Sequence, residues 1–163
     1  MIVVSDTSPI RALAFLQQLA ILKKLFGRVL VPPVVADELR SPARLAPGES
    51  PPDLTHFPFI QVRAPADTGR VTVLAKELDR GESEAIVLAD ELRCPAILMD
   101  EAAGHEVAIR HGLVPLGTAG IFLRAKRAGL LVEIRPLLDH LIGDLGFFIA
   151  APLRRDILEQ AAE

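Results

Sequence analysis

The sequence lacks tryptophan and tyrosine, and only 7 of its 163 residues are phenylalanine. Half of the residues are nevertheless hydrophobic. We therefore expect an aliphatic core of Leu, Val, Ile and Ala, large enough for one domain over residues 1–163. With so few aromatic side chains, few faces remain on which a nucleic-acid base could stack.

Cysteine is nearly absent as well. The one cysteine, Cys94, excludes an intramolecular disulfide framework and a cysteine-based zinc site, and it fits a reducing compartment. No apolar run approaches the roughly 20 residues that a membrane-spanning helix needs, and no signal peptide is visible. We therefore expect a cytoplasmic protein without a membrane partner.

The charge balance gives no general attraction to nucleic acid. The formal net charge is −3, so an anionic partner would have to be met by a local basic patch.

Short apolar runs alternate with helical patterns along the chain. The runs at 2–4, 29–31, 96–99 and 113–116 are typical of strands, and 59–62 is typical of an edge strand. Helices are predicted over 9–19, 21–26, 33–40, 71–78, 82–92, 102–111, 119–128, 135–142 and 152–161. This alternation predicts an α/β fold with a mostly parallel sheet covered on both faces. The proline-rich segment 41–57 is predicted to be an exposed loop of the same domain.

The first strand ends at an acid. Asp6 follows the apolar run 2–4, and Ser8 with Pro9 is typical of a helix start, with Ser8 at the N-cap. Asp6 should therefore lie at the carboxyl edge of the sheet, where open α/β sheets bind ligands. The alternative is that Asp6 only caps the helix.

Other acids are predicted to reach the same edge. Glu84 lies in the first turn of a helix and Asp100 ends another strand, so both should converge with Asp6. Glu38 lies in the helix after the second strand. Carboxylates brought close together repel, and a divalent cation relieves that repulsion. Oxygen ligands without a His or Cys cluster favour Mg²⁺ or Mn²⁺, which suits phosphodiester hydrolysis.

Each acid also has a structural interpretation without a metal. Glu82 and Glu84 stabilise a helix N-terminus through the helix dipole. Glu38 fits a solvated helix face, and Glu101 fits the cap of the helix that begins at residue 102.

Five motifs, in order, resemble those of PIN domains. They are Val3-Val4-Ser5-Asp6-Thr7-Ser8, Val34-Val35-Ala36-Asp37-Glu38-Leu39, Gly81-Glu82-Ser83-Glu84-Ala85-Ile86, Ile97-Leu98-Met99-Asp100-Glu101 and Leu116-Gly117-Thr118-Ala119-Gly120. The third motif is similar to a PIN subgroup with Gly-Glu-x-Glu-Ala-Ile, related to the VapC-type toxins. The resemblance covers nearly the whole chain.

This resemblance implies an α/β/α sandwich and a Mg²⁺- or Mn²⁺-dependent endoribonuclease. Because many members of the family are toxins of toxin–antitoxin pairs, it also implies that role as an expectation. The metal ligands that it implies are Asp6, Glu38, Glu84 and Asp100, with Thr7 or Ser8 in support. It also implies an RNA substrate, a cognate antitoxin and a homodimer as partners.

Two positions depart from the family pattern. Residues two apart on a helix diverge by roughly 200°, so Glu82 and Glu84 cannot both face the site. Glu84 is favoured because Ala85 and Leu88 follow it, with Glu82 and Glu101 as alternates. Arg11 stands where the family has a small or apolar residue, and it would compete with a metal if it faced the acids.

The candidate contacts to RNA are basic residues on one helix and beside the loop, namely Arg124, Lys126, Arg127, Arg40 and Arg44. Two other function classes stay open. One is a phosphatase with Asp6 as nucleophile, although such enzymes usually carry a second Asp where Ser8 stands. The other is a catalytically weak PIN-like binding or regulatory protein.

Overall fold

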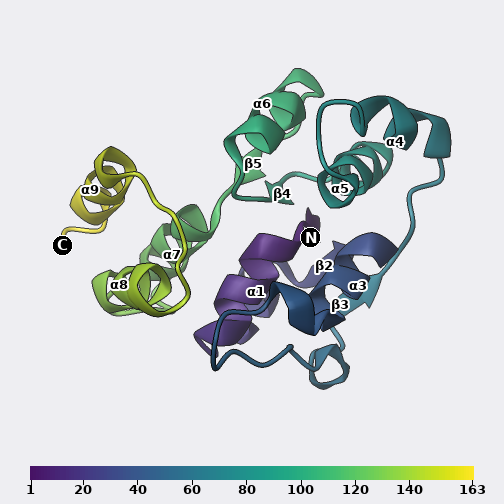
Figure 1. The fold of residues 1–163 in the computed structure, drawn as a ribbon. Helices are drawn as coiled ribbons and strands as arrows, with labels where there is room; N and C mark the ends of the chain where they lie inside the picture. Colours follow the sequence, from purple (N-terminus) through teal and green to yellow (C-terminus); the bar gives the residue numbers. More distant parts are fainter.

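The computed structural model describes the backbone of residues 1–163 and every side chain except that of Arg44. A five-stranded, all-parallel sheet forms its centre. The strands lie in the order β3 (Ile60–Val62), β2 (Arg28–Val31), β1 (Ile2–Ser5), β4 (Ile97–Leu98) and β5 (Pro115–Leu116). The predicted parallel sheet is therefore confirmed (Figure 1).

The strand order reverses beside β1. From β1 the chain proceeds to β2 and β3 on one side, and later to β4 and β5 on the other. The neighbouring strands β1 and β4 form the central pair, and Ser5 pairs with Leu98 at its end. The crevice at such a reversal, beyond the carboxyl ends of the strands, is where open parallel sheets bind ligands.

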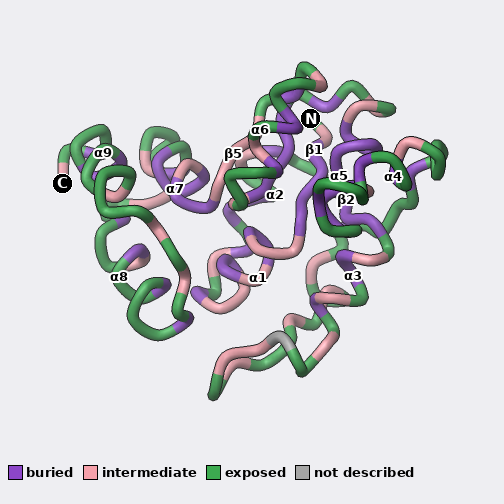
Figure 2. The backbone as a smooth tube through the Cα atoms, turned by 45° about the horizontal axis from the view of Figure 1, so that its top comes forward, coloured by how far each residue is buried: buried purple, intermediate pink, exposed green. Residues whose placement is uncertain are grey.

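Two cores separate the sheet from its helices. Successive residues of a strand face opposite sides, and accordingly Val3 belongs to one core and Val4 to the other. The first core lies under α1 (Thr7–Phe15), α2 (Ala20–Phe26), α3 (Pro33–Arg40), α7 (Thr118–Arg127), α8 (Arg135–Asp144) and α9 (Ala151–Gln160). The second lies under α4 (Thr68–Leu74), α5 (Arg80–Glu91) and α6 (Ala102–Arg110). Figure 2 shows the buried course of β1 between them, and the predicted three-layer α/β/α sandwich is confirmed.

The predicted element boundaries are confirmed only in part, because α1 ends at Phe15 instead of residue 19 and α4 covers 68–74 instead of 71–78. Helix α3 has the predicted bounds, and α2 ends at Gly27, whose φ of +83° allows the left-handed turn of a helix stop. Helix α1 begins at Thr7, so the prediction of Ser8 as its N-cap is wrong. The N-cap position belongs to Asp6, whose side chain makes no capping hydrogen bond. Asp6 is therefore not explained as a helix cap.

The segment 41–57 contains two short 3₁₀ turns, Pro42–Arg44 and Leu54–His56, and is otherwise irregular. It leaves the body of the fold after α3 (Figure 2). None of the helices in the described chain is long and apolar enough to cross a membrane.

Candidate active site

The Asp6 carboxyl is buried at the reversal point of the sheet. Its backbone N–H donates to Leu98 O at 2.8 Å, which joins the ends of β1 and β4. The residue is only 6% exposed. Burial, together with the charges of Asp79, Glu82 and Glu38, raises the pKa of Asp6 to about 7, although the hydrogen bond from the Thr7 N–H lowers it. Asp6 therefore lies among other carboxylates, as the sequence predicted for this edge.

Glu82 is the acid of α5 that joins this group. The Glu82 N–H donates to Asp79 Oδ1 at 2.8 Å, and Glu82 Oε2 accepts from the Asp79 N–H at 3.3 Å, which forms a capping box. The second oxygen, Oε1, is buried without a hydrogen-bond partner. Burial raises the pKa of Glu82 to about 7, with contributions from Asp79 and Glu101. Such an unpaired buried oxygen suits a ligand.

Glu84 lies elsewhere on α5. Its Oε1 accepts from Arg80 Nε at 3.3 Å, one helical turn earlier, while its Oε2 is buried without a hydrogen-bond partner. The sequence analysis favoured Glu84 over Glu82 as the residue that faces Asp6. In the structure it is the charge of Glu82, and not that of Glu84, that acts on Asp6. The capping box fixes the start of α5 and hence its rotational phase. The pattern Asp79-x-x-Glu82 is the sequence signal that could have identified Glu82.

Three hydrogen bonds hold Asp100 after β4. Ser8 Oγ donates to Asp100 Oδ2 at 2.8 Å, Thr118 Oγ1 donates to the same oxygen at 2.8 Å, and the Thr118 N–H donates to Oδ1 at 2.7 Å. Asp100 is thereby connected to both α1 and α7. The sequence analysis assigned a supporting role to Ser8 but missed Thr118, whose position at the start of α7 was the available signal.

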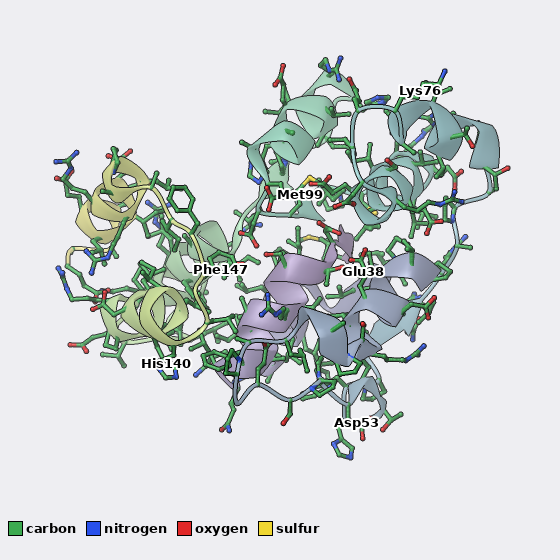
Figure 3. All side chains as sticks on the ribbon, in the orientation of Figure 1. Glu38, Asp53, Lys76, Met99, His140 and Phe147 are labelled. Carbon is green, nitrogen blue, oxygen red and sulfur yellow. The ribbon has the colours of Figure 1, made fainter. Side chains whose placement is uncertain are left out.

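Glu38 approaches the same edge from α3, as Figure 3 shows. The Thr7 hydroxyl donates to Glu38 Oε2. The two hydroxyls after β1 thus orient different acids, Thr7 holding Glu38 and Ser8 holding Asp100. Glu101 is exposed and makes no side-chain cap to α6, which weakens its interpretation as a helix cap.

Glycines make room for three of the carboxylates. A Cβ added to Gly81 would lie 3.2 Å from Asp6 Oδ1, and one added to Gly104 would lie 3.0 Å from Glu82 Oε1. A Cβ on Gly117 would lie 3.1 Å from Asp100 Oδ1. These distances are tighter than most real Cβ contacts, so a side chain at any of the three glycines would require the carboxylate oxygen to move by a few tenths of an ångström.

A cavity of about 370 Å³ opens beside the acids. Its lining includes Asp6, Thr7, Ser8, Arg11, Glu38, Asp79 and Glu101. Arg11 NH2 binds Glu49 Oε1 at 2.7 Å, and its Nε binds Glu49 Oε2 at 2.9 Å. Glu49, from the 41–57 segment, thus neutralises the charge of Arg11. Arg11 therefore does not pair with the acids of the candidate site, which the sequence analysis had considered as a way for it to compete with a metal.

The predicted RNA-binding cations are engaged in other contacts. Lys126 pairs with Glu163 at 2.8 Å, Arg127 donates to Gln160, and Arg124 lies over the Phe26 ring. Arg40 lies 3.6 Å from Asp37 on the exposed face of α3. The side chain of Arg44 lies outside the described part of the structure. A role of these residues in RNA binding stays a prediction.

The carboxylate oxygens of the site are of the type that binds a divalent cation, although they do not surround a common position in this structure. Among the described residues, no three acidic, His or Cys side chains stand close enough to share an ion. Two of the acids are instead held by Thr7 and Ser8. The available donors are carboxylate oxygens, which Mg²⁺ and Mn²⁺ prefer, and Glu82 Oε1 lacks any other partner.

The raised pKa values predict how the stability of the metal-free protein depends on pH. An acid whose pKa is higher in the folded state destabilises the fold as pH rises from its unfolded pKa to its folded pKa. For Asp6 and Glu82 this interval runs from 3.8 and 4.5, respectively, to about 7. We expect the free energy of unfolding, measured by urea denaturation in EDTA, to fall between about pH 4 and about pH 7. Asp6→Asn should flatten this fall, and an equal slope in that variant would contradict the prediction.

Comparison with known proteins gives one family. A family model described as a PIN domain matches residues 2–163, which is nearly the whole chain. No curated protein gives a significant match.

Proposed function

Because the chain belongs to the PIN-domain family, we propose that it is a Mg²⁺- or Mn²⁺-dependent endoribonuclease. PIN domains are generally nucleases that typically use divalent metal ions, so the hydrolase class and a nucleic-acid substrate follow from the family. The observation that carries the finer proposal is the buried pair Asp6 and Glu82, both with a pKa raised to about 7 at the reversal point of the sheet. The fold retains this costly pair where a ligand is expected.

In this proposal Asp6, Glu38, Glu82 and Asp100 would hold the metal, with Glu101 beside them at the cavity. Because no three acids of the described residues stand close enough to share an ion, these side chains would have to close in on it. Thr7 orients Glu38, while Ser8 and Thr118 orient Asp100. Hydrogen bonds of this kind fix ligand orientation and tune metal affinity. A bound divalent cation lowers the pKa of a water and offsets charge on the phosphate. Glu84 is left out of this ligand set because its charge does not contribute to the raised pKa of Asp6, whereas the charge of Glu82 does.

The residues themselves then set the geometry of hydrolysis. Two of the four carboxylates, those of Asp6 and Glu38, line the acidic cavity, so we place the RNA phosphate in that cavity. Arg11 lines the same cavity, where its guanidinium can bind a phosphate oxygen when the Glu49 pair opens.

The direct test is cleavage of single-stranded RNA by the purified chain with Mg²⁺, with Mn²⁺ and with EDTA. We expect internal cleavage only with the cations, and a higher melting temperature when either cation is added. The cation-induced rise should be larger at pH 8 than at pH 5, because the acids bind protons at the lower pH. Absence of both cleavage and a cation-induced rise would overturn the proposal.

The same assay separates the other function classes. A phosphatase with Asp6 as nucleophile would release phosphate from p-nitrophenyl phosphate. A binding protein would retain RNA without cleaving it. Membership of the PIN-domain family, in which many proteins are toxins, supports the further proposals of a toxin role in the cytoplasm, a cognate antitoxin over the cavity, and a homodimer.

A further inference from the structure

A second cavity adjoins the acidic one. Its volume is about 620 Å³, within the range of small-molecule sites. The two cavities share Ser8, Arg11 and Glu101 in their linings. Across the second cavity from Asp100 and Glu101 lies the segment 146–150, which connects α8 to α9. The space is therefore a continuation of the candidate active site toward the C-terminal helices.

An exposed aromatic ring stands at the rim of this second cavity. Phe147 and Ile149 pack against the first core, whereas Phe148 between them is 87% exposed. This alternation is that of an extended strand, in which successive side chains face opposite ways. Figure 3 shows Phe147 on this segment, between α7 and the centre of the fold. The packed neighbours hold the backbone of the segment, so the position of Phe148 is set by the core.

The cavity has two chemically different ends. Arg11, held by Glu49, is shared with the acidic cavity, whereas Phe148 and Leu153 line the second cavity and not the acidic one. A nucleotide has the same division, since its phosphate is anionic and its base is flat and apolar. Arginine binds phosphate oxygens, and a phenylalanine face stacks on any base. Asp100 and Glu101 on the remaining wall disfavour a second phosphate there.

We propose that this cavity is a subsite for one nucleotide of single-stranded RNA flanking the cleaved phosphate, with the base stacked on Phe148 and its phosphate beside Arg11. This subsite rests on the proposed endoribonuclease function. It supplies the base-stacking face that a sequence without Trp and Tyr otherwise lacks. Because stacking accepts every base, the subsite fixes the position of the strand rather than its sequence.

The test is binding of a short, fluorescein-labelled single-stranded RNA, followed by fluorescence anisotropy in EDTA so that no hydrolysis occurs. Phe148→Ala should raise Kd about tenfold or more, and Phe148→Tyr should stay close to the original protein, because a stacked base contributes roughly 1–3 kcal/mol. Val132→Ala is the matched control, since Val132 is 88% exposed and lines neither cavity. It should leave Kd unchanged.

A strand of the same length with abasic sites identifies the contact. The original protein and Phe148→Ala should bind that strand equally well. The subsite would be overturned if the original protein and Phe148→Ala bound the intact strand with equal Kd values. It would also be overturned if Phe148→Ala weakened binding of the abasic strand as much as binding of the intact strand. A dimer of the original protein that Phe148→Ala dissociates in size-exclusion chromatography would overturn it too, because the ring would then contact a second copy.

Cleavage by the original protein is measured separately with Mg²⁺. Binding that depends on Phe148, without cleavage, would overturn the hydrolytic function and leave a nucleotide-binding site. Cleavage with binding that is independent of Phe148 would overturn only the subsite. All variants should melt at the same temperature, because the ring is exposed.

Discussion

Asp6→Asn should reduce metal-dependent RNA cleavage by at least about a hundredfold while leaving the protein folded. The amide has the size of the carboxylate but no charge, so it fits the same space beside Gly81 and binds a divalent cation poorly. Above about pH 7 the metal-free variant should be more stable than the original protein, because the buried charge is gone. The measurements are initial cleavage rates with Mg²⁺ and melting temperatures in EDTA.

Asp37→Asn is the matched control for this experiment. Asp37 precedes Glu38 on α3 but its carboxylate is mostly exposed and lies 3.6 Å from Arg40. Its replacement should change the cleavage rate little. A cleavage rate for Asp6→Asn close to that of the Asp37 variant would show that Asp6 does not bind the metal.

Glu82→Gln should cause a loss of cleavage comparable with that of Asp6→Asn, whereas Glu84→Gln should retain activity within a few-fold. Glutamine at position 82 keeps the capping box, because its amide oxygen still accepts from the Asp79 N–H. The helix start should therefore remain intact while the charge is removed. The two variants carry the same single change two residues apart on one helix, on nearly opposite faces, so each controls for the other.

The readouts are the cleavage rate and the cation-induced rise in melting temperature. The Glu82 variant should lose most of both, and the Glu84 variant should keep both. The opposite result, with Glu84 required and Glu82 dispensable, would restore the assignment that the sequence motif alone favoured. Loss in both variants would indicate that α5 reorients when a metal binds.

The strands and the sheet edge could be predicted because β-branched apolar runs and acids at strand ends are local features. Asp6 and Asp100 follow directly from that reasoning, since each ends one of the two central strands. The choice between Glu82 and Glu84 could not be made by the apolar residues that follow them. It depends on where α5 starts, and Asp79 decides that through its cap.

The hydrogen bonds of the site depend on pairs that are distant in sequence. Thr118 lies 18 residues after Asp100, and Ser8 lies 92 residues before it. No local pattern connects these positions, because the tertiary fold brings α1 and α7 to the end of β4. The same holds for Lys126, a predicted RNA contact, and Glu163, with which it pairs at 2.8 Å. Contacts of this range require the assembled sheet.

The glycines beside the carboxylates have a consequence for how such sites diversify. Gly81, Gly104 and Gly117 carry no functional group, yet each borders one oxygen of a different acid. An alanine at any of them would displace that oxygen without altering the acid itself. A lineage can therefore weaken or redirect a site of this kind while retaining all of its acids. The presence of the acids alone therefore does not determine which chains with this fold are active. The glycine beside each acid matters as well.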